Sequence, residues 1–317
     1  IMKNVFITSA TRTAIGSLNK SLKSVPAFKL GASVITESIK KANLKKDEID
    51  EIIFGQVLTG GTGQNPARQA SIESGIPKEK PAYLINQVCG SGIRSVASGF
   101  QSIKSGESQI VIAGGQESMS QAPHSIHLRD GKKFGDAKFT DTMIKDGLWD
   151  AFNDYHMGMT AENVAEKFQI TREEQDLFAI NSQEKALKAQ KENKFSEEIV
   201  NFKIQSKKSK VDFNKDEHPR DSVDIDVLRK LKPVFKKNGS VTAGNSSGIN
   251  DGAAAVALMS EAALKKNNAK ILASIKSWAS CGVDPALMGT GPIPSTKKAL
   301  DLAGWDIKDV DLFEINE

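Results

Sequence analysis

The sequence predicts an α/β protein with an inserted segment, and three observations carry that prediction. Short apolar runs rich in β-branched residues, typical of strands, alternate with longer segments whose apolar residues recur at helical spacing. Such alternation favours a mostly parallel sheet covered by helices on both faces. Residues 303–317 resemble residues 42–56, which favours a duplicated α/β unit. Between about 119 and 240 the alternation stops, which indicates a segment inserted over the core.

The elements of the first unit follow from their own residues. Residues 4–10 (NVFITSA) are a short β-branched run and predict the first strand. Residues 27–43 carry apolar side chains at helical spacing and predict a helix. The alternation then continues with a strand, a helix and a buried strand that ends in glycines, over residues 49–58, 91–106 and 108–115.

The inserted region is richer in Lys, Asp, Asn and His than the segments around it. Its clear helices lie at 160–169 and 171–192, without a buried strand between them. Thr171, followed three residues later by Glu174, predicts a capping box at the start of the second helix. Regular alternation resumes at 251–266, whose alanine-rich start predicts a helix.

The composition excludes several classes of protein. Two cysteines, Cys89 and Cys281, cannot build a disulfide framework, which favours a reducing compartment. No Cys-x-x-Cys or His-x-x-x-His spacing suggests a metal site, and a net charge of +4 is too small to indicate nucleic-acid binding. No apolar run approaches the ~20 residues of a transmembrane helix, and the first residues lack the features of a secretory signal. The basic stretch 203–237 is either a solvated face or a surface that attracts a polyanionic small molecule.

The repeat also bears on the end of the sequence. Its first copy continues well beyond Gln56, whereas its second copy stops at Glu317, directly after a predicted strand. A sheet that ended there would leave unpaired backbone groups along its edge. We therefore expect the sequence to be the front part of a longer protein, with its second unit incomplete.

Cys89 follows an apolar run and precedes Gly90 and Gly92, in the stretch NQVCGSGIRS. The pattern predicts a strand, a tight turn and a helix that begins near Gly90. A thiol at a helix N-terminus lies near unsatisfied backbone N–H groups and the positive end of the helix dipole, and both favour the thiolate. The two glycines let another backbone or a ligand approach closely. Cys89 is thus a candidate nucleophile for acyl transfer, with a small buried hydrophobe as the alternative.

Two other segments are rich in loop-forming residues. Residues 241–256 (VTAGNSSGINDGAAAV) join glycines to hydrogen-bonding side chains, a combination found both in ligand-binding loops and in ordinary connections. Residues 288–295 (MGTGPIPS) predict a rigid turn.

Six stretches resemble the thiolase family, in the family's order and across essentially the whole chain: NQVCGSGIRSVASG, GGQESMSQAPH, DGLWDAFNDYHMGMTAENVA, TAGNSSGINDGAAA, GVDPALMGTGPIPS and FEINE. The stretch YHMG further resembles the short-chain members, acetyl-CoA C-acetyltransferases. The resemblance implies a thiolase fold, with duplicated mixed-sheet α/β units in a layered αβαβα core and an inserted loop domain. It implies an N-terminal core domain (1–118 plus 250–268), an inserted domain for CoA binding and tetramer contacts (119–249) and the start of a C-terminal core domain (269–317).

The resemblance also implies a chemical mechanism. The cysteine at the position of Cys89 takes an acyl group from acyl-CoA as a thioester. Asn316 would hold a water at one oxyanion site, and the backbone N–H of Cys89 would contribute to another. The family's Gly-His-Pro and Cys-x-Gly-Gly-Gly motifs do not occur in the sequence, and Cys281 in SWASCGVDP does not match the second motif. Cys281 is therefore expected to be structural.

For substrate binding, the resemblance places the pantetheine arm along one loop, the ligand channel along four side chains and the adenine near one arginine. These residues are Ala243, Ser247, Gly248 and Ile249 for the arm, Leu148, His156, Met157 and Met288 for the channel, and Arg220 for the adenine. Val227 stands where some relatives have a hydroxyl residue near the nucleotide. Without the resemblance, His156 would be a core histidine and the methionines ordinary packing. Residues 124–139 resemble the loop that pairs dimers into tetramers, and otherwise are a surface loop.

The resemblance thus implies an acetyl-CoA C-acetyltransferase. The enzyme would condense two acetyl-CoA to acetoacetyl-CoA and CoA, reversibly, through acetyl-Cys89. It would use CoA as substrate and product, with no tightly bound cofactor and no metal, as a cytoplasmic homotetramer without nucleic-acid or membrane partners. Three alternatives stay open: a 3-ketoacyl-CoA thiolase of broader chain length, a decarboxylating condensing enzyme, and a noncatalytic truncated chain that acts by binding or assembly.

Overall fold

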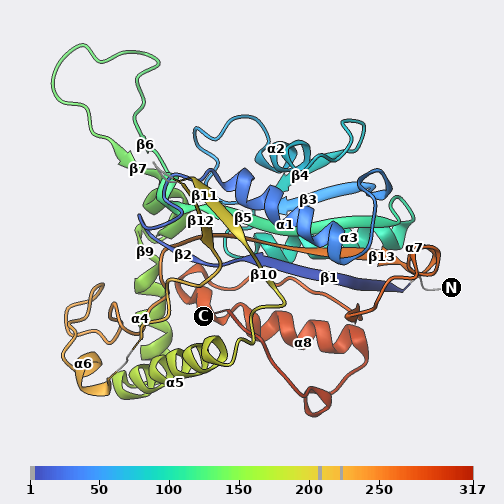
Figure 1. Ribbon diagram of the computed structural model, residues 1–317. Helices are drawn as coiled ribbons and strands as arrows, with labels where there is room; N and C mark the ends of the chain where they lie inside the picture. The colour runs from blue at the N-terminus through green and yellow to red at the C-terminus, as the bar shows by residue number, and fades with distance from the viewer. Residues whose placement is uncertain (1–3, 206–208, 222–223, 317) are drawn as a thin grey trace. The chain divides into compact units, whose positions relative to one another are not determined.

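The computed structural model describes residues 4–205, 209–221 and 224–316 (Figure 1). The contacts divide the chain into two compact units. Unit 1 comprises Ile1–Gly147, Phe195–His218 and Ile249–Ile275, and unit 2 comprises Leu148–Lys194, Pro219–Gly248 and Lys276–Glu317. In the described residues, no helix is both long and apolar enough to cross a membrane.

Unit 1 is built on a mixed sheet of eight strands. The order along its main path is β10-β1-β13-β5-β3-β4, with β14 paired to β1 and β2 paired to β13. The predicted mostly parallel sheet is wrong at the centre, because β13 runs antiparallel to both β1 and β5. The strands are β1 (Val5–Thr13), β2 (Gly16–Ser17), β3 (Glu51–Gly55), β4 (Ala82–Ile85), β5 (Ile110–Ser118), β10 (Ile199–Val200), β13 (Asn250–Ser260) and β14 (Ala273–Ile275).

Strand β13 also corrects a predicted helix. The alanine-rich residues from 251 onward form the central strand instead. Ala255 and Ala257 are buried beneath α1, and the backbone of Ala254 lies close to Gly114 of β5. Alanine favours helices in isolation, but here its small side chain fits a strand that is covered closely by its neighbours, so tertiary packing outweighs propensity.

Helices cover the two faces of this sheet, as the alternation predicted. Helices α1 (Ala27–Lys41) and α2 (Pro66–Glu73) pack on the face to which Ile52 and Phe54 point. Helix α3 (Ser91–Ser105) packs on the opposite face, against Ile53. Successive residues of β3 therefore serve two separate hydrophobic clusters. A short helix, α7 (Glu261–Asn267), follows β13.

Residues 195–218, which the sequence pattern assigned to the insertion, lie in unit 1. Strand β10 pairs in parallel with β1, and Arg12 of β1 donates to Glu198 at 2.6 Å and to Asp216 at 2.7 Å. These contacts hold the segment on the main sheet. The small elements of the insertion within unit 1 are η2 (Met119–Gln121), β6 (His124–Ser125), β7 (Thr140–Asp141), β11 (Phe202–Gln205) and β12 (Lys210–Phe213).

Unit 2 is mainly helical. Helices α4 and α5 form where the sequence predicts them, and the capping box of Thr171 and Glu174 is confirmed, with the Thr171 N–H donating to the Glu174 carboxylate at 2.7 Å. Helix α4 packs against η4. The elements are β8 (Trp149–Asp150), β9 (Tyr155–His156), α4 (Met157–Lys167), α5 (Arg172–Lys191), α6 (Ile225–Arg229), η4 (Pro285–Thr290), α8 (Pro292–Ala303) and η5 (Ile307–Asp309). A π-helical turn, η3 (Met143–Leu148), lies in unit 1 except for its last residue.

The sequence repeat is a structural repeat up to its last strand. After α1, Asn43 takes a left-handed conformation and a 3-10 turn, η1 (Lys46–Glu48), follows, with the Lys45 N–H donating to the Glu48 carboxylate at 2.9 Å. After α8, Gly304 and η5 do the same, with the Asp306 N–H donating to the Asp309 carboxylate at 2.9 Å. The predicted strand at the end of the second copy is wrong, because residues 310–316 form no strand. A strand needs a hydrogen-bonding neighbour, and none in the described residues pairs with this segment.

Candidate active site

Cys89 lies at an exposed, tight turn between β4 and α3, as predicted. The Gly90 N–H donates to the Gln87 carbonyl at 3.1 Å, and the Ser91 N–H donates to the Val88 carbonyl at 3.0 Å. Val88 has a φ of 48°, a left-handed conformation that strains a β-branched residue. The thiol thus stands on a strained turn directly before a helix whose first N–H groups lack a side-chain cap.

The turn is fixed by Ser91 and by a close approach of α3 to the sheet. The Ser91 hydroxyl accepts from the Gln87 N–H at 2.8 Å and donates to the Val88 carbonyl at 2.5 Å. A Cβ atom on Gly55 would lie 2.5 Å from the backbone carbon of Ser91, so only glycine at the end of β3 lets the helix start there. Sequence reasoning missed Gly55, because its partner is remote in the sequence.

Glu117, at the end of β5, supports the neighbouring connection after β3. Its carboxylate accepts from the N–H groups of Val57 at 2.8 Å and Leu58 at 3.2 Å. Burial raises the pKa of Glu117 to about 7; the two N–H groups oppose that shift, and Asp251 adds to it. This carboxyl therefore changes charge near neutral pH.

In unit 2, His156 caps α4. Its Nδ1 accepts from the Gly158 N–H at 3.0 Å, which places the proton of the neutral ring on Nε2. The ring stacks on Phe235, with centroids 4.7 Å apart, and burial lowers the pKa of His156. Phe235 lies so close to Gly158 that a Cβ there would come within 2.2 Å of its ring. His156 is therefore a neutral donor through Nε2 at neutral pH.

The structure places the three other predicted channel residues on or next to elements of unit 2. Met157 is the first residue of α4, Leu148 lies just before β8, and Met288 is exposed in η4. The Asn163 amide holds α4 and η4 together, donating to the Tyr155 hydroxyl at 3.1 Å and to the Ala286 carbonyl at 3.0 Å. Unit 2 therefore brings Met157 and Met288 onto two elements that are tied to each other.

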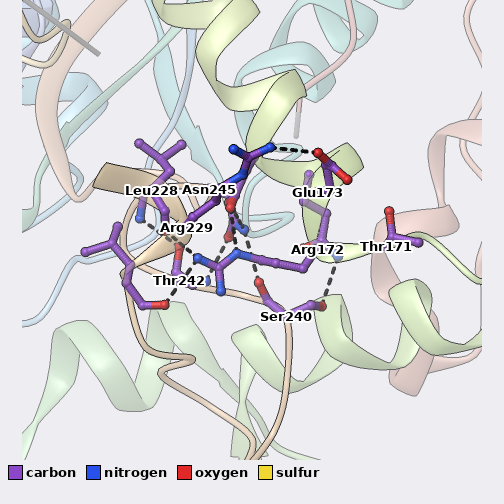
Figure 2. Close-up of polar contacts among 12 residues, drawn as sticks. Thr171, Arg172, Glu173, Leu228, Arg229, Ser240, Thr242 and Asn245 are labelled. Carbon is purple, nitrogen blue, oxygen red and sulfur yellow. Dashed lines mark hydrogen bonds and ion pairs between the residues drawn. The ribbon is translucent and has the colours of Figure 1, made fainter. Parts of the chain in front are cut away.

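The loop Ser240–Gly248, which carries three of the residues predicted to contact the pantetheine arm, has an inner and an outer side. Val241 and Thr242 are buried, whereas Ala243 and Ser247 are exposed. Figure 2 shows the inner side, where side chains from α5 reach the loop. The residues predicted to contact the pantetheine arm include Ala243 and Ser247 on the outer side, and that contact stays a prediction; sequence reasoning missed the supporting residues on the inner side.

The remaining predicted residues are divided between the two units. Ile249 is half-buried in unit 1; Arg220 and Asn316 are exposed in unit 2. The Arg220 N–H donates to the Gln183 side chain at 3.0 Å, and Asn316 lies in the segment without a strand. Gly248 and Cys281 are half-buried in unit 2. Within the basic stretch 203–237, residues 206–208 and 222–223 lie outside the described residues.

Comparison with known proteins identifies the family. Residues 5–262 match the thiolase N-terminal domain, and residues 269–317 match the thiolase C-terminal domain. The chain belongs to the thiolase family. It is 54% identical over 314 residues to an acetyl-CoA acetyltransferase of Rhizobium meliloti, covering 99% of this chain and 80% of the relative. It is 50% identical to the cytosolic acetyl-CoA acetyltransferase of Rattus norvegicus, covering 99% and 79%.

A solved structure agrees with this assignment. The crystal structure of the Bacillus anthracis acetyl-CoA acetyltransferase matches this thiolase with a TM-score of 0.96 and 40% identity, covering 98% of this chain and 79% of that one. The predicted thiolase fold is therefore confirmed, and the chain is an acyltransferase of that family. The described residues contain no group of three or more His, Cys, Asp or Glu side chains that could hold a metal ion.

Proposed function

We propose that this thiolase is an acetyl-CoA C-acetyltransferase that condenses two molecules of acetyl-CoA to acetoacetyl-CoA and CoA, reversibly. The observation that carries the proposal is the exposed thiol of Cys89 on the strained turn at the start of α3. Relatives at 50–54% identity that carry this activity in their names support the choice of substrate.

The proposed reaction has two acetyl transfers, one to the sulfur of Cys89 and one from it. The Cys89 thiolate attacks the thioester carbonyl of acetyl-CoA, and the bond to CoA breaks, so that CoA leaves as a thiol after taking up a proton. The carbanion formed by loss of a proton from the methyl group of a second acetyl-CoA then attacks acetyl-Cys89. The Cys89 thiolate leaves, and acetoacetyl-CoA forms. Both steps pass through an oxyanion, for which the Cys89 N–H and a water on Asn316 are the proposed donors.

The substrate contacts of the proposal follow the outer side of the loop. Exposed Ala243 and Ser247, with Gly248 and Ile249, would lie along the pantetheine arm. His156 offers a neutral Nε2–H donor in the channel, with Leu148, Met157 and Met288 as apolar lining. Arg220 would face the nucleotide, whose phosphates fit the basic stretch 203–237. No tightly bound cofactor is part of the proposal.

We also propose an assembly state, from exposed side chains on one loop, and a cellular location, from a relative. The hairpin β6–β7 carries a loop whose apolar side chains are exposed, among them Phe134 at 84% and Phe139 at 68%. Exposed aromatic side chains of this kind are typical of protein contacts, and a homotetramer would cover them. We place the enzyme in the cytoplasm, like the cytosolic relative from rat.

The test is acetylation of Cys89. Brief exposure of the full-length protein to acetyl-CoA should add one acetyl group, which peptide mass spectrometry should locate on Cys89. The Cys89→Ala variant should take up none while still binding CoA, and Cys281→Ala should be acetylated like the wild type. Undiminished acetoacetyl-CoA formation by Cys89→Ala would contradict the proposal, and a preference for longer acyl chains would instead favour a broad 3-ketoacyl-CoA thiolase.

A further inference from the structure

Glu162 of α4 is a buried carboxylate that binds the loop Ser240–Gly248 directly. It is 4% exposed. Oε1 accepts from the Ser240 N–H at 2.9 Å and from the Val241 N–H at 2.8 Å, and Oε2 accepts from the Ser240 hydroxyl at 3.1 Å. A buried carboxylate is costly unless its oxygens are satisfied, and here the start of the loop satisfies them. Any conformation that withdrew Ser240 and Val241 would leave this charge without its donors.

Asp176 of α5 holds the middle of the same loop. It is fully buried, and its Oδ1 accepts from the Asn245 amide at 2.9 Å. Asn245 in turn closes the loop on itself, donating to the Ser240 carbonyl at 3.0 Å and accepting from the Thr242 N–H at 2.8 Å. The backbone on both sides of Ala243 is therefore set by one amide whose own position depends on Asp176.

Arg172 extends the same network to α6. Its Nε donates to the second oxygen of Asp176 at 2.8 Å, and its guanidinium donates to the carbonyls of Leu228 at 2.5 Å and Leu231 at 3.2 Å. These carbonyls lie at the C-terminal end of α6, where unsatisfied carbonyl groups attract a cation. Figure 2 shows this arginine between the loop and the main chain at Leu228.

We propose that Glu162 and Asp176 are positioning residues for coenzyme A, which hold the loop Ser240–Gly248 in the one conformation that presents Ala243 and Ser247 to the pantetheine arm. The inference rests on the proposed function for the identity of the ligand. Neither carboxylate touches substrate; each acts through backbone N–H groups or through Asn245. Their loss should weaken the affinity for CoA thioesters while leaving chemistry at Cys89 intact.

The test compares four variants of the full-length protein. Asp176→Asn and Glu162→Gln remove the two buried charges with little change of shape, and Asn245→Ala cuts the link between Asp176 and the loop. Glu173→Gln is the matched control, because Glu173 lies on the same helix as Asp176 and its side chain forms an exposed ion pair with Arg229, at 2.9 Å. The measurements are KM and kcat for acetoacetyl-CoA thiolysis, the Kd of CoA by calorimetry, and hydrogen exchange of the amides in residues 240–248.

We expect Asp176→Asn and Asn245→Ala to raise KM and the Kd of CoA by about tenfold or more, from the loss of a hydrogen bond to a charged group. Their kcat should change less than about threefold. Loop amides should exchange faster in both variants and in Glu162→Gln, and Glu173→Gln should match the wild type. If the loop amides and the Kd of CoA are unchanged in Asp176→Asn and Asn245→Ala, the proposal is wrong. If kcat falls as much as KM rises, the network is merely structural and the proposal is again wrong.

Two further outcomes can be interpreted, and the second separates this proposal from the proposed function. If Asp176→Asn does not fold, Asn245→Ala decides alone, since Asn245 is only partly buried. If wild-type Cys89 is not acetylated by acetyl-CoA, the proposed reaction fails, but hydrogen exchange and the Kd of CoA still decide whether the two carboxylates set the loop.

Discussion

The turn at Cys89 and the loop Ser240–Gly248 both present exposed residues, but different interactions hold them in place. The turn is fixed by hydrogen bonds within residues 87–91 and by a glycine that lets α3 approach the sheet. The loop is fixed by carboxylates that lie more than sixty residues earlier in the sequence, at Glu162 and Asp176. The nucleophile thus depends on local backbone geometry, and the proposed binding loop depends on buried charge from another part of its unit.

The largest effect should come from closing the space under the turn. Gly55→Ala would push a methyl group to within 2.5 Å of the Ser91 backbone, which cannot move aside as a side chain could. Overpacking of this kind should lower the free energy of unfolding by about 3 kcal/mol or more. It should also slow acetylation of Cys89 by displacing the start of α3. Calorimetry would measure the loss of stability, and quench-flow mass spectrometry would measure the rate of Cys89 acetylation.

Gly92→Ala is the matched control for this variant. A Cβ atom at Gly92 meets nothing within 4 Å, so the melting temperature of the Gly92→Ala variant should stay close to that of the wild type. Equal destabilisation by the two alanines would show that the turn does not depend on the close approach at Gly55.

Glu117, like Glu162, is a carboxylate that accepts backbone N–H groups, and its pKa makes a prediction about stability and pH. Glu117 has a pKa of about 7, above its ordinary value of 4.5. The folded state therefore keeps a proton that the unfolded state releases between these values, so stability should fall as pH rises from about 4.5 to 7 and then level off. Glu117→Gln should remove this dependence, which amounts to on the order of 2 kcal/mol. Denaturant unfolding at pH 5 and pH 8 would measure it; equal slopes with pH in variant and wild type would contradict the assignment.

Ser91→Ala tests the turn with a smaller change. It removes the acceptor for the Gln87 N–H and the donor to the Val88 carbonyl, and should cost about 1–2 kcal/mol of stability. Because Val88 is strained, the loosened turn should relax and acetylation of Cys89 should slow by about tenfold. Ser105→Ala, which removes one hydroxyl bond to the Ser102 carbonyl in the last turn of the same helix, should leave the rate unchanged. A rate loss shared by both serine variants would mean that the helix, rather than the turn, is responsible.

The contrast between turn and loop also explains which parts of the site could be predicted from sequence. The turn was predictable because strand, turn and helix start are adjacent, so Cys89 and the beginning of α3 were placed correctly. The outer residues of the loop, such as Ser247, were identified by resemblance. Glu162 and Asp176 were missed, because a lone Glu or Asp on a helix that is rich in charged residues carries no local sign that it is buried.

The fold shows the same division between local and remote interactions. Local signals in the repeat predicted an apolar helix before each copy, and α1 and α8 are found there; the structure adds a left-handed residue, Asn43 or Gly304, and a 3-10 turn after each helix. They failed for residues 310–316, because a strand depends on a neighbour that its own sequence does not specify. They failed for β13 for the same reason, since burial between two strands decides its conformation against the helical preference of alanine.

The smallest effect should come from the cap of α5, the helix that carries Arg172 and Asp176. Thr171→Ala removes one half of the capping box and should cost about 1 kcal/mol of stability. The affinity for CoA should fall less than twofold, because Asp176 stays fixed by Arg172 and Asn245 and does not depend on the first turn of the helix. Thermal unfolding and calorimetric titration of the same sample would give both numbers. A loss of CoA affinity as large as that in Asp176→Asn would mean that the helix as a whole, and not its buried carboxylate, sets the loop.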